Sequence, residues 1–100
     1  MNDKNLKKME KKCDDVANLL KVLGHPKRLM ILCHLADEEM NVSELQEVCD
    51  ISQSQLSQFL TSLTHQNIVA ARKEGTFSYY SITNDDVKKI VKTLYKIFVN

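Results

Sequence analysis

The 100-residue sequence predicts a mainly α-helical fold with one small β-hairpin. Apolar residues recur at intervals of three and four over most of the chain, and helix-starting residues stand where these stripes begin. Between residues 68 and 82 the period changes to that of strands, in two runs joined through Glu74-Gly75-Thr76. These observations give the predicted order of four helices, a hairpin and a last helix.

The first two predicted helices are separated at Gly24. An amphipathic stripe predicts the first helix over about residues 5–23, through Met9, Cys13, Val16, Leu20 and Leu23. His25-Pro26 restarts the chain, since proline suits a first helical turn. The buried side of the second helix is marked by Leu29, Leu32, Cys33 and Ala36. The acidic residues 37–39 then predict a loop.

The third and fourth helices are short and lie close together in the sequence. Ser43 is the predicted N-cap of the third helix, which ends near Cys49-Asp50. The pattern Ser52-Gln53-Ser54-Gln55 fits a capping box. It opens a helix whose buried stripe is Leu56, Leu60 and Leu63. Two such helices over about residues 43–66, joined by about three residues, predict a helix-turn-helix, whose second helix can lie in the major groove of DNA. The hairpin of residues 68–82 is then a wing, and residues 1–100 form one winged helix-turn-helix domain.

The last helix is predicted over about residues 84–98. Asn84 and the pair Asp85-Asp86 stand at its start, where the helix dipole favours negative charge. Its apolar face is wide and comprises Val87, Ile90, Val91, Leu94, Ile97 and Phe98. Because so small a chain buries only a modest core, this face needs a further surface to cover it. We therefore predict a homodimer through the first and last helices.

The charge distribution identifies one candidate surface for nucleic acid. The net charge of +1 gives no support to nucleic-acid binding by itself, but residues 51–71 contain no Asp, Glu, Lys or Arg. The polar residues off the buried stripe of the fourth helix are candidates for contacts to bases and phosphates: Gln53, Ser54, Gln55, Ser57 and Gln58. Arg72 and Lys73, near the wing tip, are predicted to neutralise phosphates, although Glu74 beside them opposes this. Phe59, Tyr79 and Tyr80 are interpreted as packing residues.

Other classes of protein fit the sequence less well. With two glycines, no phosphate-cradling loop and no nucleophile motif, the chain is not predicted to be an enzyme or to bind a cofactor. No apolar run is long enough to span a bilayer, and three widely spaced cysteines suit a reducing compartment, so a cytoplasmic protein without membrane contact is expected.

The order of the elements resembles the ArsR/SmtB family over nearly the whole chain. Residues 23–29, 52–60 and 72–80 resemble the family's second-helix start, recognition helix and wing. Phe59 departs from the pattern, since the family commonly has His there. The resemblance implies a homodimeric repressor whose recognition helices enter successive major grooves of an inverted repeat in double-stranded operator DNA. It also implies release of the DNA by a chemical signal.

The metal-binding positions of the family are vacant in this chain. Its Cys-x-Cys site falls on residues 41–43, which are Asn, Val and Ser, and no His follows His65 for a site on the last helix. His34 and Glu38, one turn apart, are interpreted as surface residues. No metal site is predicted, and a metal-responsive repressor with an atypical site stays an alternative.

The segment around Cys33 resembles the sulfide- and redox-responsive branch of the family, the BigR, SqrR and HlyU group. The second cysteine of that branch falls at Val99 here, so the usual dithiol cannot form. Cys33 is the candidate redox residue, with Cys13 as the other cysteine expected near the dimer core, while Cys49 is interpreted as structural. Both candidates are open to a second interpretation as small buried apolar residues. A winged-helix module that binds protein rather than DNA is the remaining alternative.

Overall fold

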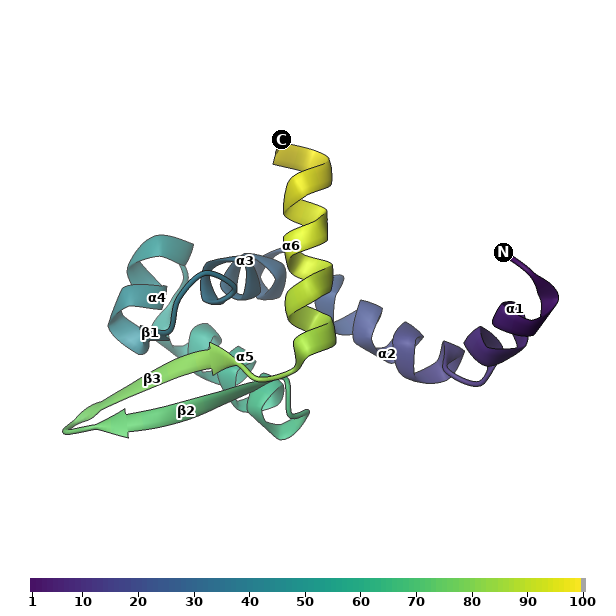
Figure 1. The fold of residues 1–100 in the computed structure, drawn as a ribbon. Helices are drawn as coiled ribbons and strands as arrows, with labels where there is room; N and C mark the ends of the chain where they lie inside the picture. The colour runs from purple at the N-terminus through teal and green to yellow at the C-terminus, as the bar shows by residue number, and fades with distance from the viewer. Residues whose placement is uncertain (100) are drawn as a thin grey trace.

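The computed structural model describes residues 1–99 and confirms the predicted fold class, a winged helix-turn-helix (Figure 1). The elements in chain order are α1 (Asp3–Glu10), α2 (Cys13–Leu23), α3 (Pro26–Leu35), β1 (Met40–Asn41), α4 (Val42–Cys49), α5 (Gln53–His65), β2 (Val69–Glu74), β3 (Phe77–Ile82) and α6 (Asp85–Val99).

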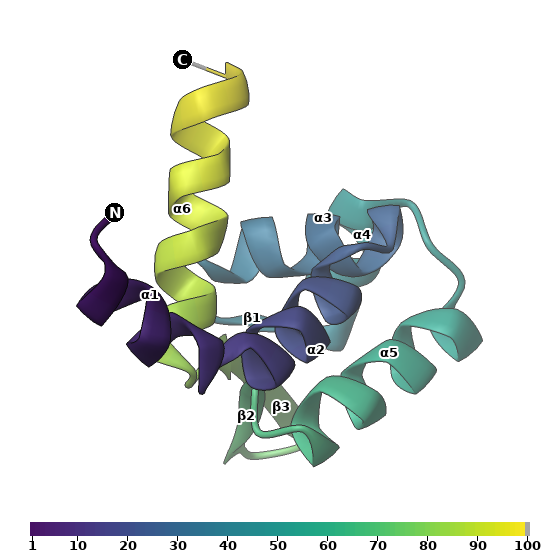
Figure 2. The same cartoon turned by 90° about the vertical axis from the view of Figure 1, so that its right-hand side faces the viewer.

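The core lies where α3 meets α4, α5 and the base of α6. Helix α3 contributes the fully buried Ile31 and Leu32, and α5 contributes the three leucines of its predicted stripe. Val87 and Val91 seat the first half of α6 on this core. The second half of α6 extends beyond the body of the molecule, and α1 and α2 extend to one side (Figures 1 and 2).

The wing is an antiparallel sheet in the order β1-β3-β2. Strands β2 and β3 pair from Val69 with Ile82 to Glu74 with Phe77, and Gly75 occupies the left-handed region at φ 62° in the connecting turn. The sequence predicted this hairpin but not β1, in which Met40 pairs with Tyr80. A two-residue strand carries no period of its own, so only its pairing reveals it.

The predicted first helix is wrong in one respect, because the chain forms two helices there. The backbone between α1 and α2 makes a tighter turn, in which Lys12 N donates to Met9 O at 2.9 Å. Residues 1–15 are all exposed, so no packing holds this segment straight. Lys7, Lys8, Lys11 and Lys12 also stand three and four residues apart, where like charges destabilise a continuous helix.

The predicted caps of the helix-turn-helix need two corrections. Asn41, not Ser43, is the N-cap of α4: Asn41 Oδ1 accepts from Glu44 N, and Glu44 Oε1 accepts from Asn41 N, both at 2.9 Å. Pairing in β1 fixes the extended backbone that an N-cap needs, which places Ser43 inside the helix. Ser52 caps α5 as predicted, since its Oγ accepts from Gln55 N at 3.1 Å, but the return bond of a capping box is absent within the described chain.

Several large apolar side chains stay exposed on the helices that extend from the body. On α1 and α2 they are Leu6, Met9 and Leu20, and at the end of α6 they are Tyr95, Ile97, Phe98 and Val99. These helices are the ones predicted to form a dimer interface. Among residues 1–99, no helix has the length and apolar character needed to cross a membrane.

Candidate nucleic-acid interface

Helix α5 is anchored on one side and presents polar side chains on the other. Leu56, Leu60 and Leu63 point into the core, which leaves the opposite face of the helix outside. All five polar candidates predicted from the sequence are exposed on α5: Gln53, Ser54, Gln55, Ser57 and Gln58. Gln53 is the first residue of the helix and stands in line with the leucine stripe, while Ser54 and Gln58 lie on the opposite face. Amide and hydroxyl groups on such a face can both donate and accept hydrogen bonds, which is what the edges of bases and the phosphate oxygens require.

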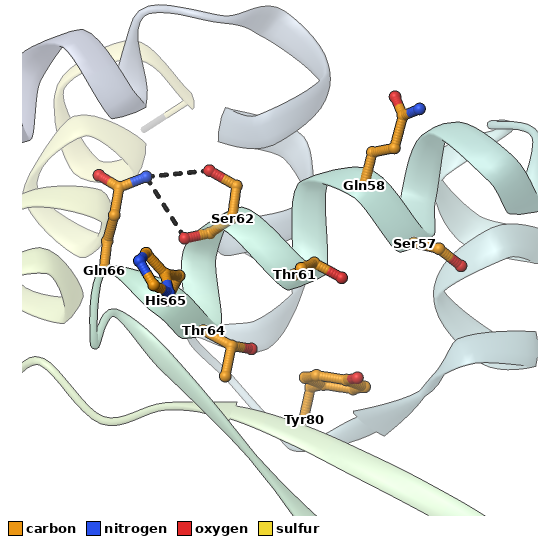
Figure 3. A pocket seen from close by; sticks show the side chains of 8 residues that line it. All are labelled: Ser57, Gln58, Thr61, Ser62, Thr64, His65, Gln66 and Tyr80. Carbon is orange, nitrogen blue, oxygen red and sulfur yellow. Dashed lines mark hydrogen bonds between the residues drawn. The ribbon is translucent and has the colours of Figure 1, made fainter.

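A wide, shallow hollow of about 920 Å³ runs between the wing and the part of α5 from Ser57 onward (Figure 3). Its lining residues are Ser57, Gln58, Thr61, Ser62, Thr64, His65, Gln66 and Tyr80. Within it, Gln66 Nε2 donates to Ser62 Oγ at 3.0 Å and to Ser62 O at 3.4 Å. The sequence analysis named only two of these residues as site candidates. Thr61 and Thr64 follow Ser57 at helical spacing, and that spacing was the signal for a polar face extending along α5.

A lysine of α3 forms hydrogen bonds to the turn between α4 and α5. Asp50 ends α4 in the left-handed region at φ 48°. The Lys27 ammonium donates to Asp50 O at 3.2 Å and to Cys49 O at 3.5 Å. Burial raises the pKa of the Cys49 thiol, and the nearby Lys27 charge acts in the opposite direction. Sequence reasoning missed this role of Lys27, since the contacts span 22 and 23 residues.

Phe59 makes packing contacts within the chain. Its ring lies 5.0 Å from the His25 ring, centroid to centroid, and the Arg28 guanidinium carbon lies 5.9 Å from its centroid. Arg28 Nη2 also donates to Lys21 O at 3.3 Å, and His25 caps α3 by accepting from Lys27 N at 3.1 Å. The start of α3 therefore contacts the middle of α5.

Arg72 on the wing is engaged by two carboxylates. Its Nη2 lies 2.5 Å from Glu39 Oε1 and its Nη1 lies 2.8 Å from Glu74 Oε2. Its guanidinium carbon also lies 5.1 Å from the Tyr79 ring centroid. The hydrogen bond from Arg72 lowers the pKa of Glu39, and the two carboxylates raise the pKa of Arg72. Glu74 is the opposing charge that the sequence predicted, whereas Glu39 is 33 residues away and has no signal in the sequence near Arg72.

Lys73, the neighbouring cation on the wing, differs from Arg72 in its ion pairing. Lys73 is exposed and forms no ion pair with any residue from 1 to 99. A phosphate can approach Lys73 directly, whereas at Arg72 it must compete with carboxylates that are already bound.

The cysteines occupy three different environments, and all are free. Cys13 is exposed at the start of α2, Cys33 is half-buried on α3, and Cys49 is buried. Cys33 lines a cavity of about 310 Å³ between α3 and α6, together with Ala36, Asp37, Lys92, Tyr95 and Lys96. Burial raises the pKa of the Cys33 thiol, and the Asp37 charge raises it further. In the part of the chain that is described, no three His, Cys, Asp or Glu side chains gather where they could hold a metal ion.

Comparison with known proteins gives consistent matches. Residues 25–71 match the family described as bacterial regulatory protein, arsR family. The biofilm growth-associated repressor of Agrobacterium fabrum is 43% identical over 90 residues, which is 90% of this chain and 77% of that protein. The transcriptional activator HlyU of Vibrio cholerae is 37% identical over 94 residues, covering 94% of this chain and 87% of that protein.

A solved structure matches at the level of the fold. The crystal structure of the transcriptional repressor BigR from Xylella fastidiosa aligns with a TM-score of 0.87 at 41% identity, covering 92% of this chain and 94% of that one.

Proposed function

The chain belongs to the ArsR family of bacterial regulatory proteins, and from that membership we propose that it is a homodimeric regulator that binds double-stranded operator DNA in the cytoplasm. The family relatives are transcriptional regulators with a helix-turn-helix, not enzymes. In this chain the helix-turn-helix consists of α4 and α5, with the β2–β3 hairpin as the wing.

The observation that carries the proposal is the exposed, uncharged polar face of α5. Gln53 and Ser57 lie one turn apart near the N-terminal end of this helix, and neither is buried. A glutamine amide can bond an adenine through both its donor and its acceptor, and a serine hydroxyl can bond either a base or a phosphate. With no carboxylate between residues 51 and 71, the helix approaches a phosphate backbone without repulsion from its own side chains.

Dimerisation would place two copies of α5 on one duplex. The apolar residues exposed on α1, α2 and the end of α6 would be covered by the same helices of a second chain. Two recognition helices related by a two-fold axis read two half-sites about one helical turn apart, so the proposed operator is an imperfect inverted repeat.

For the signal that releases DNA, the proposal is thiol chemistry at Cys33. The cavity beside Cys33 gives a small reagent access to the sulfur. With a peroxide as two-electron oxidant, the product is a disulfide with Cys13, formed as the two thiols lose two protons and two electrons and the peroxide is reduced to water or an alcohol. With a polysulfide or a small disulfide, the Cys33 thiolate attacks one sulfur of the reagent and displaces the rest as a thiolate or hydropolysulfide, which leaves a persulfide or mixed disulfide on Cys33 alone. The raised pKa of Cys33 acts against this chemistry, because the thiolate is the reactive form.

The test of DNA binding is a salt titration. A duplex is first selected by the purified protein from a randomised library, and a scrambled duplex of equal composition serves as the reference. Binding through phosphates should weaken linearly in log affinity against log salt, and the selected duplex should bind more tightly than the scrambled one at every salt concentration. If no duplex is enriched and binding shows no salt dependence, the chain is a winged-helix module for protein partners instead.

A further inference from the structure

Lys27 connects the start of α3 to the turn of the helix-turn-helix. It lies in the first turn of α3 and is half-buried. Its ammonium donates to two successive backbone carbonyls, Asp50 O at 3.2 Å and Cys49 O at 3.5 Å. The Lys27 ammonium thus forms a hydrogen bond to the backbone of Asp50, 23 residues away in the sequence.

A cation such as the Lys27 ammonium is stabilising at the turn between α4 and α5. The last carbonyl groups of a helix lack intrahelical donors and carry the negative end of the helix dipole, so a cation there is stabilising. Asp50 also holds a positive φ of 48°, in the left-handed region that aspartate adopts more readily than most residues other than glycine. Ile51 is buried directly after it, and Ser52 caps α5 one residue later. The direction in which α5 leaves α4 therefore depends on this short segment.

The same end of α3 holds α5 at a second point. The His25 ring packs on Phe59, and the Arg28 guanidinium lies over that ring. Phe59 stands about one and two-thirds turns along α5 from its start at Gln53. Residues 25–28 thus contact α5 through its preceding turn and through its middle, which fixes both its position and its angle.

We propose that Lys27 is a positioning residue for DNA recognition: its ammonium holds the carbonyls of Cys49 and Asp50 and so sets the direction in which α5 presents its polar face. The proposal rests on the proposed DNA binding. It assigns Lys27 to the turn and not to a phosphate, since the ammonium is already bonded to the two carbonyls.

The test compares Lys27→Met, Lys27→Arg and a matched control, Lys8→Met, on the polar side of α1 away from the apolar Leu6 and Met9. Each is titrated with the selected and the scrambled duplex at several salt concentrations. We expect Lys27→Met to bind the selected duplex about two- to fivefold more weakly, the range that corresponds to loss of a cation at a helix end, while the scrambled duplex and the salt slope do not change. Lys27→Arg should restore most of the loss, because it keeps donors for the carbonyls, and Lys8→Met should bind like the wild type.

Amide hydrogen exchange in the protein without DNA gives an independent measurement. The turn of residues 50–53 should exchange faster in Lys27→Met than in the wild type, with the core of α3 unchanged. Equal weakening on both duplexes with a shallower salt slope would make Lys27 a phosphate contact and overturn the proposal. Unchanged affinity or unchanged exchange would also overturn it. If the wild type does not prefer the selected duplex, the proposed function fails, and the exchange experiment alone then decides whether Lys27 holds the turn.

Discussion

Removing the apolar side chains at the end of α6 should dissociate the dimer without unfolding the chain. The double variant Ile97→Ala, Phe98→Ala is the sharpest perturbation. In the single chain Ile97 is 64% exposed and Phe98 is 79% exposed, so neither contributes much to the fold. Leu94, one turn earlier, is half-buried, and a change there would affect the fold as well.

The magnitude follows from the exposed surface. Full burial of an Ile or Phe side chain is worth about 1.5–3 kcal/mol, so covering the exposed part of each contributes about 1–2 kcal/mol. Two residues on each of two chains then supply about 4–8 kcal/mol of association free energy. Since about 1.4 kcal/mol is a tenfold change, the dimer dissociation constant should rise by about a thousandfold or more.

Sedimentation equilibrium over a range of concentrations measures this constant, and circular dichroism checks that the helices are retained. The matched control is Phe77→Ala, which removes an exposed phenylalanine at the first residue of β3. Strand β3 begins at the wing tip, which lies far from α6 (Figure 1), so this change should leave the dimer intact. A double variant that dimerises with the constant of the wild type would refute the assignment of α6 to the interface.

Three further changes have defined outcomes. Glu39→Gln should leave Glu74 as the one carboxylate paired with Arg72, so that a phosphate competes with a single carboxylate there, which tightens binding to all duplexes and steepens the salt slope; an unchanged slope in a fluorescence titration would contradict this. Asp37→Asn should lower the raised pKa of Cys33, so that its thiolate forms at lower pH and alkylation at pH 8, followed by mass spectrometry, becomes faster; an equal rate would speak against coupling of the two groups. Leu60→Ala should reduce the free energy of unfolding, measured by urea denaturation, by about 2–5 kcal/mol, because Leu60 is one of the buried core residues of α5.

The sequence alone was enough to predict those helices and strands in which apolar residues recur at a regular interval. The stripe of Leu56, Leu60 and Leu63 predicted α5, and the run from residue 68 to 82 predicted the hairpin. The start of α4 was misplaced because two residues, Asn41 and Ser43, are both good N-caps, and the choice between them depends on pairing with β3. That pairing joins residues nearly forty positions apart and has no local signal.

The candidate site divides in the same way. The exposed polar face of α5 could be predicted, because it is the complement of the buried stripe. The hydrogen bonds that Arg72 donates to Glu39 and Lys27 donates to Asp50 O could not be predicted, because each joins groups that only the folded chain brings together. Both contacts alter the expected role of a cation: Arg72 is occupied before DNA arrives, and Lys27 stabilises the turn.

The most direct test of DNA recognition by α5 is the affinity of Gln53→Ala and Ser57→Ala for the selected duplex relative to the scrambled one. Loss of a base contact should weaken selected binding by about 1–3 kcal/mol, roughly 5- to 150-fold, with little change for the scrambled duplex. Asn18→Ala, which removes an exposed amide on α2, is the control and should bind both duplexes like the wild type. If the Gln53 and Ser57 variants keep the affinity and the preference of the wild type, α5 does not read the operator.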